Sequence, residues 1–123
     1  MTPPRESIIK QLVEAALAPD PFTEDALAIR FSEQHEHDLR YIATKGCWLN
    51  WDGARWYEEN THLAFDLARR SCRDAARDFG NGKPPSQVYS AKTIAAVERM
   101  AKADRRQATT IEQWDANDFT FST

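Results

Sequence analysis

The sequence is poor in glycine, and this shortage argues against a nucleotide-hydrolysing loop. Only four of the 123 residues are glycines. The segment from Gly80 to Lys83 is followed by Pro84, so it lacks the Ser or Thr after lysine that nucleotide-bound magnesium requires, and it also lacks the upstream spacing. We therefore expect that this chain by itself does not hydrolyse ATP.

Cysteines and long apolar runs are also scarce. Cys47 and Cys72 lie far apart, with no C-x-x-C pair. This favours a thiol-reduced intracellular protein in which both thiols pack, over a disulfide framework or a zinc module. No apolar run approaches the roughly 18 residues of a membrane span, and charged residues interrupt the N-terminus where a signal peptide would be apolar. We predict a cytoplasmic protein with no membrane partner.

The charge is nearly balanced. Sixteen basic residues face 19 acidic ones, for a net charge of -3, so nothing in the overall balance draws the molecule toward nucleic acid. Any contact with nucleic acid must come from a local patch. The length is that of one ordinary domain that buries about two thirds of its unfolded surface.

Hydrophobic spacing predicts a mainly α fold with about four helices. The predicted helices cover residues 3–17, 23–35, 61–79 and 87–106, with Thr2, Thr23 and either Asn60 or Thr61 as caps. Gly80 would end the third helix, and Met100 would point inward in the fourth. We expect an N-terminal helix and linker over residues 1–22, and a helical domain over residues 23–123. Two roles are open for the first helix: it covers the domain's own core, or it pairs with another copy.

A small antiparallel sheet is predicted between the second and third helices. Residues 39–42 form a short strand, and three of the four tryptophans follow in a hairpin with a two-residue Asp52-Gly53 turn. This turn places Leu49, Trp51, Ala54 and Trp56 on an apolar face. The hairpin would pack on the second helix through Phe31 and on the third through Leu63 or Leu67. The opposite face holds the candidate base-stacking rings, Trp48 and Tyr57, for which packing is the favoured use.

Residues 35–38, with the sequence His-Glu-His-Asp, are the best candidate for a metal or acid-base cluster. Within a helix, however, His35 and His37 point in divergent directions, and a third ligand would have to be His62, Glu33 or a distant carboxylate. A histidine-rich helix end is the favoured interpretation. We assign no catalytic residue, no metal ligand and no cofactor.

Basic residues recur at four-residue steps along the third helix and form a second group after the fourth. Such a ridge is able to meet phosphates. Asp66, Asp74 and Asp78 interleave with it, which is also typical of a solvated helix face with internal ion pairs. The candidate nucleic-acid-binding residues are Arg69, Arg70, Arg73, Arg77, Lys102, Arg105 and Arg106.

An ordered set of segments resembles the N-terminal domain of the phage and plasmid primase-helicase family. The set comprises residues 23–31, His35, residues 38–41, the tryptophan segment 48–56, residues 103–106 and residues 114–117. It spans Thr23 to Asp118 and is more specific than any single motif. In that family, the domain joins an N-terminal region to a superfamily 3 helicase core that unwinds DNA.

The resemblance implies a non-catalytic accessory domain that assists DNA engagement or coupling between modules during replication. Its implied partners are DNA and the helicase core or other replication modules, and an oligomer is left open. No Walker motif or primase region is present, which suggests a piece cut at a domain edge or a remnant gene. The alternative is an architectural or protein-interaction module that never touches DNA.

Overall fold

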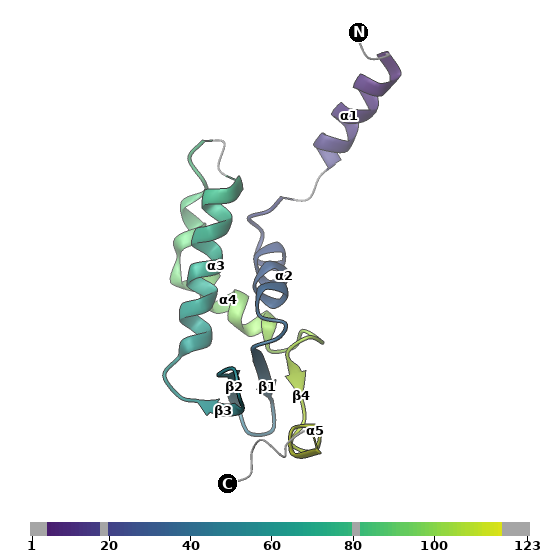
Figure 1. Ribbon diagram of the computed structural model, residues 1–123. Coiled ribbons are helices and arrows are strands. Elements are labelled where there is room, and N and C mark those ends of the chain that lie inside the picture. The colour runs from purple at the N-terminus through teal and green to yellow at the C-terminus, as the bar shows by residue number, and fades with distance from the viewer. Residues whose placement is uncertain (1–4, 18–19, 80–81, 117–123) are drawn as a thin grey trace.

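The structure is a computed structural model that describes residues 5–17, 20–79 and 82–116. Its elements along the chain are α1 (Arg5–Leu17), α2 (Glu24–Gln34), β1 (Leu39–Ile42), β2 (Cys47–Trp51), β3 (Trp56–Glu59), α3 (Leu63–Phe79), the 3-10 helix η1 (Ser86–Tyr89), α4 (Ala91–Ala101), β4 (Ala108–Thr109) and α5 (Ile111–Ala116). The fold is mainly helical with a small sheet, as predicted (Figure 1).

The sheet is mixed, whereas the prediction was an antiparallel one. Its strand order is β3-β2-β1-β4, in which β4 runs parallel to β1. The first three strands lie between α2 and α3, and the fourth comes from beyond α4. A two-residue strand carries no alternation that a sequence reading detects. Gln107 holds this strand in place, because its Nε2 donates to the carbonyl oxygens of Ser32 at 3.0 Å and His35 at 3.2 Å.

The hairpin loop has four residues, not two. Trp51 pairs with Trp56, so the loop runs from Asp52 to Arg55. The Asp52 carboxylate accepts hydrogen bonds from the backbone N–H groups of Ala54 and Arg55, each at 2.8 Å. Gly53 has a φ of 99°, which a residue with a side chain rarely adopts. Side-chain bonds from Asp52 therefore stabilise a longer turn than the Asp-Gly pair predicted.

Trp48, not Trp56, joins the sheet to the helices. Trp48 is 7% exposed, and its ring centroid lies 6.3 Å from that of Phe31 and 5.1 Å from that of Tyr41. Trp56 is half-buried and contacts Trp51, with ring centroids 5.5 Å apart. The hairpin meets Phe31 as predicted, but it does so through Trp48, whose side chain lies on the face of β2 that was predicted to be polar.

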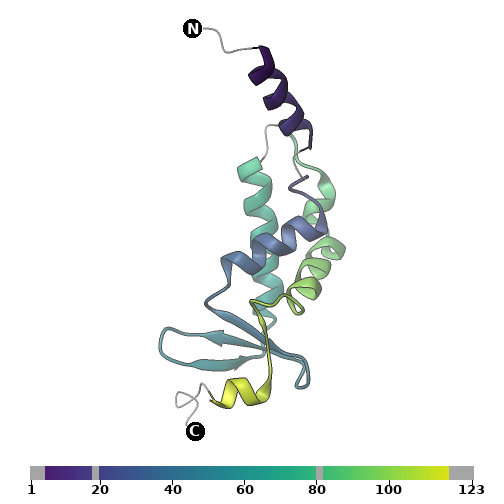
Figure 2. The same ribbon diagram turned by 90° about the vertical axis from the view of Figure 1, so that its right-hand side faces the viewer.

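Helices α2, α3 and α4 pack on one another and on one side of the sheet, and α5 lies on the other side (Figure 2). Helix α3 buries small side chains at three- and four-residue steps, which lets its neighbours approach closely. These are Ala64, Ala68, Ser71, Cys72, Ala75 and Ala76. Larger apolar side chains complete the core: Leu27, Phe31, Leu39, Trp48, Val88, Ile94 and Val97.

The helix ends confirm one predicted cap and correct others. The Thr23 hydroxyl accepts the N–H of Ala26 at 3.0 Å, as predicted. Neither Asn60 nor Thr61 caps α3. The Glu59 carboxylate does so instead, accepting the N–H groups of Thr61 and Leu63 at 3.0 and 2.9 Å. The predicted caps at Thr2 and Gly80 lie outside the described residues.

The predicted helix over residues 87–106 is two shorter elements. The Ser90 hydroxyl accepts the N–H of Thr93 at 3.1 Å, so η1 ends and α4 begins at this serine. Helix α4 stops at Ala101. Met100 is 38% exposed rather than inward, while Ile94 and Val97 are buried as predicted. A further helix, α5, forms where no periodicity was visible.

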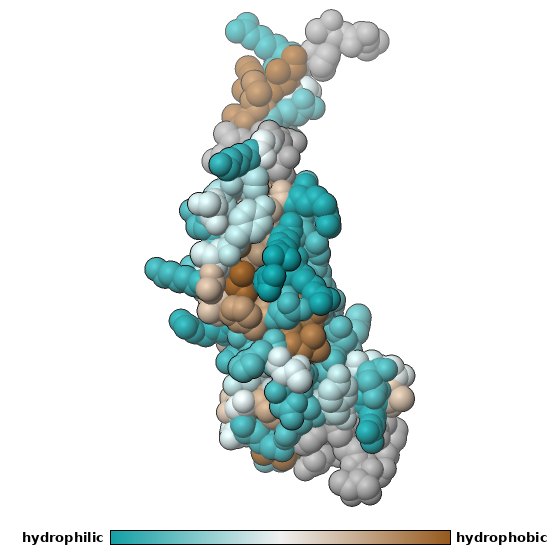
Figure 3. Space-filling view, turned by 90° about the vertical axis from the view of Figure 1, so that its left-hand side faces the viewer, coloured by the Kyte–Doolittle hydropathy of each residue, from teal (hydrophilic) through white to brown (hydrophobic). Residues whose placement is uncertain are grey.

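Helix α1 stands apart from the packed helices (Figure 1). Four of its apolar side chains are between 38% and 64% exposed, and Figure 3 shows them as a brown area at one end of the molecule; they are Ile8, Ile9, Leu12 and Val13. Helix α1 therefore does not cover the domain's own core. In the described part of the chain, every helix is too short or too polar to cross a membrane.

Candidate nucleic-acid interface

The four arginines of α3 are all exposed, but they differ in their partners. Arg70 forms an ion pair with Asp66 at 2.9 Å, one helical turn away. Arg77 pairs with Asp74 at 3.1 Å and with Asp78 at 3.5 Å. These two arginines match the solvated-face interpretation, because their charge is offset within the helix itself.

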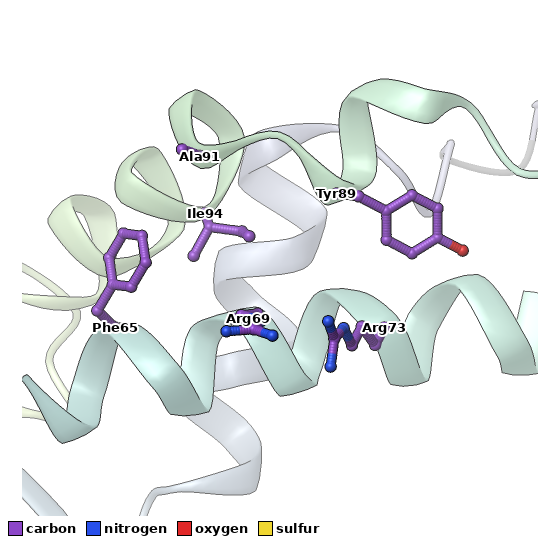
Figure 4. Close-up of a pocket in the computed structure, with 6 residues that line it drawn as sticks. All are labelled: Phe65, Arg69, Arg73, Tyr89, Ala91 and Ile94. Carbon is purple, nitrogen blue, oxygen red and sulfur yellow. The ribbon is translucent and has the colours of Figure 1, made fainter.

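Arg69 and Arg73 have no ion pair with any residue that the structure describes. They follow Phe65 at four-residue steps, so the three side chains form one row along α3. Figure 4 shows this row facing η1 and α4. The space between holds a pocket of about 500 Å³ lined by Phe65, Arg69, Arg73, Tyr89, Ala91 and Ile94.

Tyr89 supplies the aromatic side of this pocket and was missed by the sequence reading. Its side chain is 50% exposed, whereas the preceding Val88 is fully buried. Burial of Val88 fixes η1 against the core, and the Ser90 cap starts α4 directly afterwards. The available signal was a tyrosine next to a helix-capping serine, which the prediction of one continuous helix concealed.

The pocket combines positive charge with apolar and aromatic surface. Guanidinium groups bind phosphate oxygens through paired N–H donors, and an exposed ring accepts the face of a nucleobase. Ile94 is buried and Phe65 half-buried at the pocket wall. No acidic side chain is among the six lining residues. This chemistry suits a phosphorylated aromatic compound.

The second basic group lies elsewhere. The Lys102 ammonium sits 5.0 Å from the Tyr41 ring centroid, in a pocket that also contains Glu58, Glu59 and Glu98. Lys102 follows Ile94 by eight residues, which is about 12 Å along the axis of α4, so it lies away from the first pocket. The carboxylates beside it make this second pocket unsuited to phosphate.

Arg105 and Arg106 are held locally. Arg106 pairs with Asp104 at 3.0 Å, and the Arg105 guanidinium donates to the carbonyl oxygen of Ala103 at 2.7 Å. The structure therefore does not bring Lys102, Arg105 and Arg106 into the pocket that Arg69 and Arg73 line.

The two candidate stacking residues, Trp48 and Tyr57, also differ in their exposure. Trp48 packs in the core, which was its favoured use. Tyr57 is 37% exposed, and its hydroxyl accepts a hydrogen bond from the Asn50 amide at 2.7 Å. Tyr57 is therefore exposed on the sheet, away from the arginine row.

The histidines at residues 35–38 lie at the C-terminal end of α2. His35 is half-buried, with its Nδ1 atom 3.1 Å from Asp38 and its ring 5.0 Å from that of Phe31. His37 is exposed. Among the residues described, no group of three or more His, Cys, Asp or Glu side chains is arranged to hold a metal ion.

Comparison with known proteins identifies a matching family. The sequence profile described as "D5 N terminal like" matches residues 28–123. No curated protein and no solved structure matches. The matched region begins within α2 and includes the whole arginine-lined pocket, while α1 precedes it.

Proposed function

The chain belongs to the family described as D5 N terminal like, the N-terminal domain of phage and plasmid primase-helicase proteins, and from this we propose that it is a non-catalytic accessory domain that helps such an enzyme engage DNA. The family is one of N-terminal domains rather than of catalytic domains. The natural partners are then DNA and the other replication modules of the same protein. Replication would place the domain with the DNA, in the cytoplasm.

The observation that carries the DNA-engagement part of this proposal is the pocket on α3. Arg69 and Arg73, which have no carboxylate partner among the described residues, share this pocket with the exposed Tyr89. A purely architectural helix face would offset these charges as it offsets those of Arg70 and Arg77. Phosphate groups are the ligands that such uncompensated guanidinium groups bind best.

Helix α1 favours a second candidate function, docking to another protein. Its exposed apolar side chains lie outside the family match, and contiguous apolar patches of this kind mark interaction sites. The two functions are compatible, because the patch and the arginine pocket lie on different elements.

Fluorescence anisotropy with labelled single-stranded and forked DNA tests the proposal. We expect Arg69→Glu/Arg73→Glu to lose binding. Arg70→Glu/Arg77→Glu is the matched control, because it makes the same charge change on the same helix outside the pocket. If the control weakens binding as much as the pocket variant, the contact is with the overall charge of α3. If the unaltered protein does not bind DNA, the docking function takes precedence.

A further inference from the structure

The geometry points to unpaired, single-stranded nucleic acid as the ligand of the α3 pocket, with a phosphate held by Arg69 and Arg73 and a base lying on the Tyr89 ring. This inference rests on the proposed function and gives it a substrate class. A duplex offers the same phosphates, but its bases are already stacked and paired. Of the two DNA forms, only the single strand is able to use the arginines and the aromatic ring together.

The exposure of Tyr89 is the first support. Large aromatic side chains in a small domain are normally packed, since their burial stabilises the fold. The Tyr89 ring is half exposed although the adjacent Val88 is fully buried. Within the residues that the structure describes, the ring makes no hydrogen bond and no contact with another ring. Burial of Val88 therefore positions Tyr89, although the Tyr89 ring itself does not pack in the core.

The arrangement around the ring is the second support. Figure 4 shows Tyr89 on η1 and the two arginines on α3, at the same opening. Successive arginines at a four-residue step are about 6 Å apart along the helix axis, so a phosphate between them is within reach of both. A volume of about 500 Å³ is in the range of pockets that bind small molecules of nucleotide size.

The composition of the pocket is the third support. Its wall includes Phe65, Ala91 and Ile94, which offer apolar surface to a base and no hydrogen-bonding side chain that selects one base over another. Recognition by stacking tolerates every base. The expected specificity is therefore for strand state and not for sequence.

The test compares a labelled oligothymidylate with a duplex of equal length, using the full chain. The variants are Tyr89→Ala, Tyr89→Phe and, as a control, Tyr57→Ala on the sheet. We expect Tyr89→Ala to weaken single-strand binding about 5- to 150-fold and duplex binding much less. Tyr89→Phe keeps the ring and should bind as the unaltered protein does. Tyr57→Ala should leave binding unchanged.

The outcomes separate this inference from the proposed function. If Tyr89→Ala loses the same affinity for both DNA forms, or loses none, the stacking role of Tyr89 is overturned. In that case, a loss of DNA binding in Arg69→Glu/Arg73→Glu still supports DNA engagement. Thymidine monophosphate is added as a competitor of the labelled oligonucleotide. If it competes as well as unlabelled oligonucleotide at equal phosphate concentration, the ligand is a free nucleotide and the assignment to a single strand is overturned. Absence of DNA binding by the unaltered protein overturns both. Circular dichroism melts confirm that each variant is folded.

Discussion

The indole Nε1 of Trp48 donates a hydrogen bond to the Glu98 carboxylate at 3.0 Å. This contact joins β2 to α4 across fifty residues of sequence. The same ring lies edge-on to Phe31, with an interplanar angle of 77°. Trp48 thus attaches the sheet to both α2 and α4.

Replacement of this ring should be costly. We expect Trp48→Ala to lower the free energy of unfolding by about 3 to 5 kcal/mol, because it leaves a cavity and a half-buried carboxylate without its donor. Trp56→Ala, on the outer face beside Trp51 and Arg40, should cost about 1 to 2 kcal/mol. Urea denaturation measures both. A larger loss for Trp56→Ala than for Trp48→Ala would contradict the finding that Trp48, and not Trp56, packs in the core.

The tryptophan hairpin shows how far the sequence predicts the fold. Side-chain alternation correctly groups Leu49, Trp51 and Trp56 on one face, because it depends only on the strand period. It does not say which face meets the helices. That depends on the pairing of β1 with β2, in which Tyr41 lies opposite Trp48, and on long-range packing that a single sequence does not contain.

The arginine row shows the same limit at the candidate site. Its four-residue spacing was visible in the sequence, and so were the interleaved aspartates. Several arginines have an aspartate three or four residues away, so spacing alone does not decide which pairs form. In the structure, Arg70 pairs with Asp66 and Arg77 pairs with Asp74. The contribution of Tyr89 arises from a chain segment that folds back over α3, which the spacing within one helix does not predict.

The exposed face of α1 should tolerate charge. We expect Ile9→Glu and Leu12→Glu to change the free energy of unfolding by no more than about 0.5 kcal/mol, as is usual for surface substitutions. Leu27→Glu in the core of α2, where the side chain is fully buried, should unfold the domain. Thermal melts followed by circular dichroism compare the three. A large destabilisation by Leu12→Glu would show that α1 packs on its own domain.

Glu59 should make stability depend on pH. Burial works against its ionisation, but hydrogen bonds from Thr61 and from the backbone of Leu63 outweigh burial, so the pKa of Glu59 is lowered from 4.5. A lowered carboxylate pKa stabilises the folded state above the unfolded pKa. This stabilisation is lost as the pH falls from about 4.5 through the folded value.

Glu59→Gln separates this effect from general acid unfolding. The variant should melt at a lower temperature than the unaltered protein at pH 7, and the gap should narrow as the pH falls below 4.5. Glu33→Gln, at an exposed carboxylate on α2, is the control. A gap that stays constant with pH would show that the amide loses packing and not a charge-assisted cap.

The two cysteines should differ in accessibility. Burial raises the pKa of Cys72 to about 11, so almost no thiolate is present at pH 8, and the side chain is fully buried in α3. Cys47 is half-buried on β2. We expect iodoacetamide to modify Cys47 first and Cys72 only after unfolding in urea, as read by mass spectrometry of the peptides. Equal labelling in the folded protein would contradict the packing of α3.

The salt dependence of single-stranded DNA binding tests the central claim most directly. Each phosphate contact contributes about 0.7 to the slope of log Kd against log salt for a single strand. If Arg69 and Arg73 each neutralise one phosphate, Arg69→Ala/Arg73→Ala should lower that slope by about 1.4, while Arg70→Ala/Arg77→Ala leaves it nearly unchanged. Equal slopes for the unaltered protein and the Arg69→Ala/Arg73→Ala variant would contradict phosphate binding in the α3 pocket.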